Sequence, residues 1–170
     1  RDPTPTGYRY ASAYSYRPDR FRMTRGNERS IVTSIYNRIA IDVAAIDLKH
    51  VYLDKNERYI KDAKSGLNNI LTLEANIDQT SRVFIHDLVM SMLDEGVVCV
   101  VPTDTSMNPK ISTSYDIQTM RTGKITQWFP DSVRVNLYNE RTGKHEEVVL
   151  PKKMVAIIEN PCFILLWKAS

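Results

Sequence analysis

The sequence is poor in cysteine and has no long apolar run, and each shortage excludes a class of protein. Among 170 residues the only cysteines are Cys99 and Cys162, which lie far apart in the chain. Two isolated cysteines exclude a disulfide framework and favour a reducing compartment. The longest apolar run, Cys162–Trp167, has six residues, whereas a membrane-spanning helix needs about 20. We therefore expect no membrane span.

The first ten residues, RDPTPTGYRY, lack both an apolar segment and an initiating methionine. A secretory signal peptide requires an apolar region of about 7–15 residues. We therefore expect no signal peptide, and we expect the numbering to begin inside a longer chain. The length and the hydrophobic content of 42% suit one domain with its own core, or a fragment of a larger protein.

Motifs that carry catalytic chemistry are also missing. The sequence contains no CxxC, no HExxH and no nucleophile elbow, and its histidines stand apart at positions 50, 86 and 145. Carboxylates do not cluster at the spacing of a metal-dependent nuclease. We therefore expect no enzyme activity, no metal site and no cofactor.

Positive charge is concentrated in the N-terminal arm. Residues 1–30 contain seven arginines and three acidic residues, a net charge of +4, whereas the whole chain has a net charge of +3. Tyrosines alternate with these arginines, and three prolines oppose a regular helix. Such an arm fits either a contact between subunits or phosphate and base contacts with nucleic acid. The candidate contact residues are Arg9, Tyr10, Tyr14, Tyr16, Arg17, Arg20, Arg22 and Arg25.

An apolar stripe predicts an amphipathic helix over residues 29–47. Its members recur every three to four residues and are Ile31, Ile35, Ile39, Val43 and Ile46. Because a stripe of this kind normally faces a core, we expect it to be buried. Two short β-prone runs follow, Val51–Leu53 and Arg58–Ile60, and the polar residues between them predict a β-hairpin.

A second helix is predicted over residues 79–94. Asp78 or Thr80 can cap its start, and Gly96 supplies the left-handed residue that ends it. The five apolar residues from Val97 onward predict a strand that is buried on both faces and ends at Pro102. We expect both helices to pack on the sheet that contains this strand.

The last third of the chain is rich in β-prone runs separated by turn residues. The same four letters, RTGK, occur at 121–124 and at 141–144. Neither copy fits a phosphate-binding loop, which requires GxxxxGK, then Ser or Thr, then a helix. We interpret both as hairpin turns. The predicted class is α+β: a mixed α/β body of two main amphipathic helices on a sheet, with a β-rich C-terminal third.

The order of three segments resembles a known family. They are SIYNRIAIDVAAIDLKHVYLD, then GLNNILTLEANIDQTSRVFIHDLVMSMLDEGVVCVVPTDT, then ITQWFPDSVRVNLYNERTGKHEEVVLPKKMVAIIENP. Together they are similar to the N-terminal half of tailed-bacteriophage portal proteins of the siphophage type. The resemblance covers about residues 20–161 and rests on overall sequence and segment order, not on a diagnostic motif.

The resemblance implies a structural role in the virion. Portal subunits form a ring of twelve at one capsid vertex, through which terminase drives double-stranded DNA and to which the neck and tail attach. It therefore implies other portal subunits, terminase, the major capsid or scaffold protein and the head-tail adaptor as partners. The implied location is the capsid vertex, after assembly in the host cytoplasm.

The resemblance also suggests three segments: a basic arm at 1–28, a portal wing-like domain at 29–161 and a non-family tail at 162–170. In the family, the stem and clip follow the stretch that matches IIENP. We expect the tail to mark a truncation or a reading-frame change, and its competitor is a genuine C-terminal strand. Two other functions stay open: a prophage-encoded truncated portal that interferes with portal assembly or is sensed by host defence, and a small DNA-binding module that uses the arm.

Overall fold

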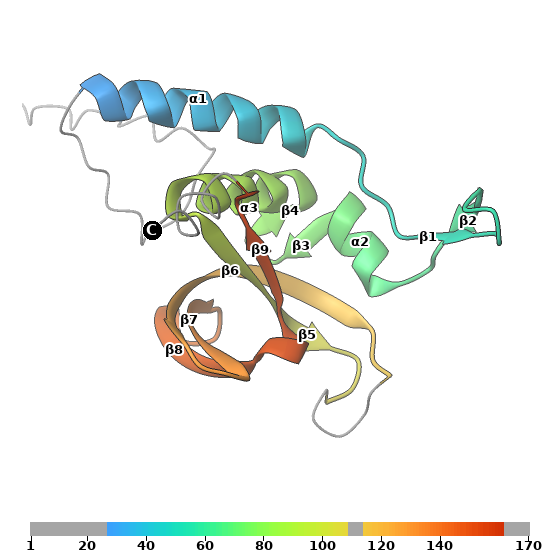
Figure 1. Ribbon diagram of the computed structural model, residues 1–170. Coiled ribbons are helices and arrows are strands. Elements are labelled where there is room, and N and C mark those ends of the chain that lie inside the picture. Colours follow the sequence, from blue (N-terminus) through green and yellow to red (C-terminus); the bar gives the residue numbers. More distant parts are fainter. Residues whose placement is uncertain (1–26, 109–113, 162–170) are drawn as a thin grey trace, which may run out of the picture.

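The computed structural model describes residues 27–108 and 114–161 (Figure 1). The elements are α1 (Asn27–Ala44), β1 (Val51–Leu53), β2 (Tyr59–Asp62), α2 (Gly66–Thr72), β3 (Glu74–Asn76), β4 (Gln79–Thr80), α3 (Ser81–Glu95), β5 (Val97–Thr105), β6 (Ile117–Trp128), β7 (Ser132–Asn139), β8 (Lys144–Pro151), a 3-10 turn (Lys152–Met154) and β9 (Ala156–Glu159). These helices and strands confirm the mixed α+β class predicted from the sequence.

A five-stranded antiparallel sheet forms the centre of the fold. Its strands lie in the order β8-β7-β6-β5-β9, so the last strand returns to pair with β5. The sheet is strongly curved, with β7 and β8 bending away from the helices (Figure 1). Two smaller sheets, β1-β2 and β3-β4, lie outside it.

Alternate residues of β5 enter two different cores, one on each face of the sheet. The helix-side core consists of the buried residues Ile70, Ala75, Phe84 and Val100. The sheet-side core, inside the curve of the sheet, consists of the buried residues Cys99, Val101, Val133 and Val135. Because successive side chains of a strand point to opposite faces, one apolar run supplies both cores. The prediction of a strand buried on both faces is confirmed.

Helix α3 begins and ends where the sequence predicts. Thr80 is the N-cap, and its hydroxyl accepts a hydrogen bond from the backbone N–H of Val83 at 3.5 Å. Gly96 has φ +77°, the left-handed conformation that a glycine adopts without steric cost. Asn160, just after β9, donates its N–H to the carbonyl of Gly96 at 2.8 Å, so the end of β9 is held at the end of α3.

Helix α1 packs on α3, which in turn packs on the sheet. Ala40 is fully buried against Val89 and Met90 of α3, and His86 of α3 is hydrogen-bonded to Asn37 of α1 at 2.9 Å. The arrangement is helix on helix on sheet, and it differs from the expectation that both helices pack on the sheet. Helix α3 is therefore buried on two faces, one against each neighbour.

The prediction of a turn at 121–124 is wrong, because these residues lie inside the continuous strand β6. Gly123 is opposite Cys99 of β5, and a Cβ at position 123 would lie 2.3 Å from Cγ1 of Val135. The glycine therefore permits close strand packing and not a change of direction. The prediction at 141–144 is confirmed, since this segment joins β7 to β8 and Gly143 has φ +66°.

Pro102 does not end β5, contrary to the prediction. The strand continues to Thr105, and its pairing with β6 shifts register between Pro102 and Asp104. Proline lacks the N–H that a regular ladder uses, so it is tolerated where the ladder is irregular. Pro102 marks a bulge in β5, and β5 spans nearly the whole width of the body.

Candidate subunit interface

Most of the apolar stripe predicted for the first helix faces solvent, whereas Val43 packs on α3 as expected. Ile31 is 60% exposed and Ile35 is 53% exposed. Two further apolar side chains on α1 are exposed beside them, and we call the four together the α1 stripe: Ile31, Val32, Ile35 and Ile39. The expectation that these residues are buried is wrong, and so is the same expectation for Ile46, which follows the helix.

The stripe is exposed because α1 has apolar residues on two adjacent faces and α3 covers only one of them. At 3.6 residues per turn the stripe occupies an arc of about 100°. The neighbouring arc faces α3 and contains Tyr36, Ala40 and Val43. A helix with a single partner normally has a single apolar face, so the second face on α1 indicates a second partner.

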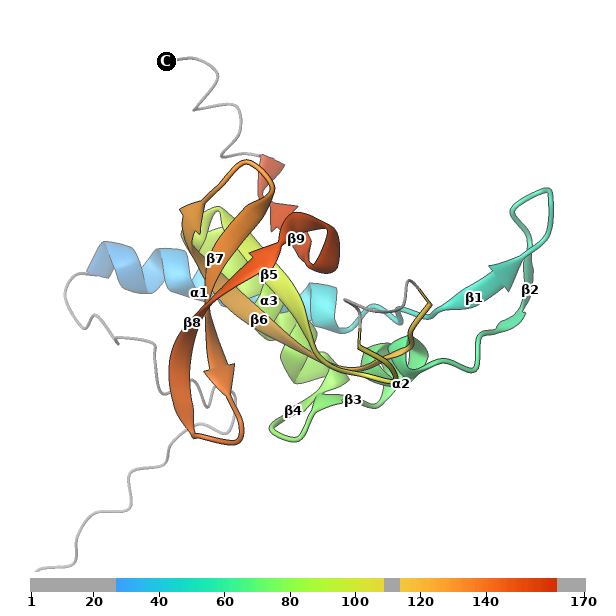
Figure 2. The same ribbon diagram turned by 90° about the horizontal axis from the view of Figure 1, so that it is seen from below.

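The β1-β2 hairpin stands away from the body, as both views show (Figures 1 and 2). Its turn is well defined: the carboxylate of Asp54 accepts hydrogen bonds from the N–H of Asn56 at 2.7 Å and of Arg58 at 2.9 Å. Glu57 takes a left-handed conformation, with φ +60°. The predicted hairpin is confirmed, and its tip is a defined structure.

Apolar and aromatic side chains cover this hairpin although it is surrounded by solvent. Leu53 and Tyr59 are direct register partners and are 52% and 63% exposed. We call the four exposed side chains, which are distributed over both faces of the hairpin, the hairpin surface: Tyr52, Leu53, Tyr59 and Ile60. An isolated two-stranded hairpin is marginally stable at best in water, and exposing these apolar side chains to solvent does not stabilise it.

One tyrosine of this surface also has a perturbed phenol. The hydroxyl of Tyr59 donates a hydrogen bond to the carboxylate of Asp62 at 3.1 Å. This hydrogen bond is the main reason that the pKa of Tyr59 is raised above its ordinary value of 10.0. The phenol therefore stays protonated and neutral, which suits a side chain at an apolar contact.

The foot of the hairpin is fixed to the body by polar contacts. The N–H of His50 donates to Oδ1 of Asn68 at 3.1 Å, and Nδ1 of His50 is hydrogen-bonded to Oγ of Ser65 at 2.8 Å. Across the hairpin base, Ala63 donates its N–H to the carbonyl of His50 at 2.8 Å. Ser65 also caps α2, so the direction of the hairpin is tied to the start of that helix.

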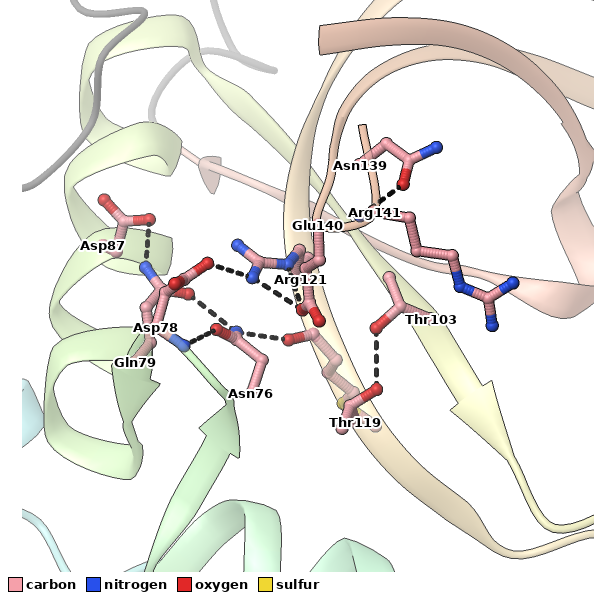
Figure 3. Close-up of polar contacts among 11 residues, drawn as sticks. Asn76, Asp78, Gln79, Asp87, Thr103, Thr119, Arg121, Asn139, Glu140 and Arg141 are labelled. Atoms are coloured by element: carbon pink, nitrogen blue, oxygen red, sulfur yellow. Dashed lines mark hydrogen bonds and ion pairs between the residues drawn. The ribbon is translucent and has the colours of Figure 1, made fainter. Parts of the chain in front are cut away.

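The buried arginine of the body, Arg121, belongs to a closed polar network (Figure 3). Its guanidinium forms ion pairs with Asp78 and Glu140, with Nε 2.7 Å from Oε1 of Glu140, and lies over the ring of Tyr138. It joins the β3–β4 turn to β6 and to the end of β7. The guanidinium is buried and both carboxylates are partly exposed, so the network joins three segments of the body around one buried charge.

The rest of the network is also internally satisfied (Figure 3). Asn76 donates from Nδ2 to Oε1 of Gln79 at 3.0 Å and to the carbonyl of Met120 at 2.8 Å. Gln79 and Thr122 both donate to Oδ2 of the buried Asp87, at 3.1 and 3.2 Å. Each side chain is used to join α3, β4 and β6, which is the pattern of a structural network.

The three histidines have three separate environments. His50 lies at the foot of the hairpin, His86 contacts Asn37 between the two long helices, and the ring of His145 lies 5.4 Å from that of Tyr138 on the β7-β8 pair. The structure therefore does not bring them together. Burial raises the pKa of the Cys99 thiol to about 11, so it is not an activated nucleophile.

The contact residues predicted in the arm, from Arg9 to Arg25, lie outside the described residues, as does the tail 162–170. Sequence reasoning missed the exposure of the α1 stripe and of the hairpin surface. A signal for the first was available, since Val32 and Tyr36 widen the apolar stripe beyond one face. A signal for the second was the pair of tyrosines at 52 and 59 beside a polar turn.

Within residues 27–108 and 114–161, no group of three or more His, Cys, Asp and Glu side chains is arranged to hold a metal ion. No helix of the described chain is both long and apolar enough to cross a bilayer. Exposed apolar side chains gather on α1 and on the hairpin, and others stand at separate places, among them Leu73, Ile77 and Trp128. The chain matches no protein-family model and no curated protein.

Proposed function

We propose that the chain is the wing portion of a siphophage-type portal subunit, and that it acts as a structural component of a ring. In this role it neither binds a cofactor nor performs catalysis. Its partners are other copies of the portal subunit, and the ring surrounds the DNA that terminase packages. The resemblance of the three sequence segments supports the family, and the surfaces of the described chain support a role in assembly.

A single observation carries the assembly role: a body with its own buried cores presents two separate apolar surfaces to solvent. The helix-side and sheet-side cores are closed around β5, so neither surface is needed to complete them. Apolar side chains that gather on the surface of a body whose cores are already closed are candidates for contact with a partner. Two such patches on one chain provide for two neighbours, as every subunit of a ring requires.

The polar network around Arg121 is consistent with this role. It ties together segments that are distant in sequence, from Asp78 to Glu140, and it leaves the interior with a fixed geometry. A ring subunit must hold its two contact surfaces at a constant angle for the ring to close. A body whose distant segments are joined through one buried arginine supports that requirement.

Sedimentation velocity over a wide concentration range, followed by electron microscopy of negatively stained particles, tests the proposal. We expect self-association into closed rings, with the monomer population falling as the concentration rises. A chain that stays monomeric up to its solubility limit would refute the assembly role. Binding of an intact portal subunit in a discrete complex, without rings of the chain alone, would favour the alternative of an interfering fragment.

A further inference from the structure

We infer that residues 8–17 of the N-terminal arm add a sixth strand to the central sheet, along the outer edge of β8 in the same chain. The occupant of this edge is thus a segment that lies outside the described residues. The inference does not depend on the proposed function, because it concerns the sheet of a single chain. It assigns the tyrosines and arginines of this segment to a contact with protein.

Strand β8 is an open and regular edge of the sheet. It stands at the end of the strand order β8-β7-β6-β5-β9, so no strand of the described chain lies beyond it. All of its residues pair with β7 in one continuous register, from Lys144 to Pro151, without the shifts that interrupt the β5-β6 and β6-β7 pairs. The outward N–H and C=O groups of such an edge can pair with a further strand.

The opposite edge of the sheet is a poorer template. Strand β9 has only four residues, and a very short edge strand is one means by which proteins avoid further pairing. Strand β8 has eight residues, and the first six of them are exposed. A ten-residue segment therefore matches β8 in length and greatly exceeds β9.

The sheet-side core is left open at β8. Val135 of β7 is fully buried in this core, whereas its direct partner on the same face of β8, Val148, is 38% exposed. Leu150 pairs on this face with the buried Val133. A strand beside β8 with large side chains on this face covers Val148 and extends the core by one row, because neighbouring side chains on one face of a sheet contact each other.

Residues 8–17, YRYASAYSYR, have the pattern of a strand. Side chains alternate between the two faces of an extended chain, so all the tyrosines share one face: Tyr8, Tyr10, Tyr14 and Tyr16. Arg9 and Arg17 fall on the other face. Tyrosine is enriched in strands, and the segment contains no proline, whereas Pro5 and Pro18 stand on either side of it. Because proline cannot donate to a ladder, these prolines delimit a strand of about the length of β8.

The charges of the segment complement those of β8. When the tyrosines lie beside Val148, the arginines lie on the face of Glu147, because adjacent residues of a strand point to opposite faces. The carboxylate of Glu147 is 4.0 Å from Arg134, and its side chain is 54% exposed. Strand β8 has one lysine and two glutamates, a net charge of −1, whereas residues 8–17 have two arginines and no acid, a net charge of +2. Opposite charges on neighbouring strands stabilise their pairing.

The same chain can reach this edge. Residues 18–26 join Arg17 to the start of α1 at Asn27, and an extended chain of this length spans up to about 30 Å. The first turns of α1 and strand β8 lie on the same side of the molecule in both views, away from the hairpin (Figures 1 and 2). The segment can therefore lie along β8 of its own chain.

Residue-resolved hydrogen exchange, measured by NMR on the full chain, tests the inference. A single neighbour protects only alternate amides of an edge strand, whereas neighbours on both sides protect every amide. The strand variant carries Ser12→Pro and Ala13→Pro, which remove one N–H of each orientation and leave the tyrosines and arginines in place. The matched control carries Thr4→Pro and Thr6→Pro, which add the same number of prolines outside the segment. Melting curves verify that the body is folded in each variant.

We expect consecutive amides from His145 to Leu150 to be protected in the unmodified chain and in the control. In the strand variant, alternate amides of this range should exchange about tenfold faster or more. Alternate protection in the unmodified chain would overturn the inference. Full protection in the strand variant would overturn it as well, since another segment would then cover the edge.

Two further outcomes separate this inference from the assembly of several copies. Protection of β8 that appears only as the chain concentration rises would overturn the inference, because the added strand would then belong to a second copy. A chain that stays monomeric while every amide of β8 is protected would refute the assembly role and support the inference.

Discussion

The body around β5 and the outer elements of the chain use apolar residues in opposite ways. In the body, the side chains of Val98, Cys99, Val100 and Val101 are buried on both faces of one strand. On α1 and the hairpin, side chains of similar size are between 41% and 63% exposed. Similar residue types are therefore buried or exposed according to whether a second layer of structure covers them.

This difference separates a body with closed cores from outer elements that have exposed apolar side chains. The body has a core on each side of β5, a closed polar network and well-formed caps on α3. The outer elements have defined backbones but no cover for their apolar side chains. Burying a large apolar side chain is worth about 1.5–3 kcal/mol, and the proposed assembly would gain this free energy on the outer elements.

The largest expected effect is a truncation in the body. Phe84→Ala removes a ring that is almost fully buried in the helix-side core, and we expect it to lower the free energy of unfolding by about 3–5 kcal/mol. Ile35→Ala on the α1 stripe is the matched comparison, and we expect less than about 0.5 kcal/mol for the monomer. Urea denaturation at low concentration measures both. Equal losses would remove the distinction between the two regions.

The next effect concerns the close approach of two strands in the body. Gly123→Ala places a methyl group against Cγ1 of Val135, and we expect a loss of about 1–3 kcal/mol from overpacking. Adding Val135→Ala should relieve part of the clash, so the double variant should be more stable than the sum of the single losses predicts. Strict additivity in a double-mutant cycle would show that β6 can move and that this packing is loose.

Alkaline pH should weaken the body through the thiol of Cys99. Its pKa is raised from 9.0 in the unfolded chain to about 11 in the fold, so the stabilisation is complete below pH 9 and is lost as the pH rises toward 11. By pH 10 the free energy of unfolding should fall by about 1 kcal/mol. Because tyrosines and lysines also titrate there, the control is Cys99→Val, which should show a smaller fall over the same range. Identical pH profiles would mean that the thiol ionises equally easily in both states.

The smallest effect on stability is expected on the outer elements. Tyr59→Ser should change the free energy of unfolding of the monomer by less than about 0.5 kcal/mol, because the side chain contacts mainly solvent and Asp62. The same substitution should weaken self-association strongly, which sedimentation equilibrium measures. A variant that associates normally would contradict the division between the regions. A monomer whose free energy of unfolding falls by more than about 1–2 kcal/mol would contradict it as well.

Much of this fold is predictable from local patterns. Thr80, Gly96 and the apolar run after it define α3 and β5 because caps and apolar continuity are local properties. The segment at 121–124 is not predictable in the same way. Glycine occurs both in turns and where strands pack closely, and only the position of Val135 on another strand distinguishes the two cases. Pro102 gives a wrong prediction of the strand end for a similar reason, because β5 accommodates the proline in a bulge and continues.

The candidate interface was less predictable than the fold. An apolar stripe at helical spacing indicates that something covers it, but not whether the cover belongs to the same chain. Here α3 covers the face around Ala40 and leaves Ile31 and Ile35 outside. That outcome depends on the length and position of α3, which are properties of the folded molecule and not of the α1 sequence.

Hydrogen exchange at two protein concentrations tests most directly the claim that the body is complete and the outer elements are not. We expect amides of Tyr59–Asp62 to exchange quickly in dilute solution and to become protected as the concentration rises, whereas amides of Val97–Val101 should be equally protected at both concentrations. Ile31→Ser with Ile35→Ser should return the hairpin to its dilute rate even at high concentration. Hairpin exchange that is identical at all concentrations would contradict self-association through the outer elements.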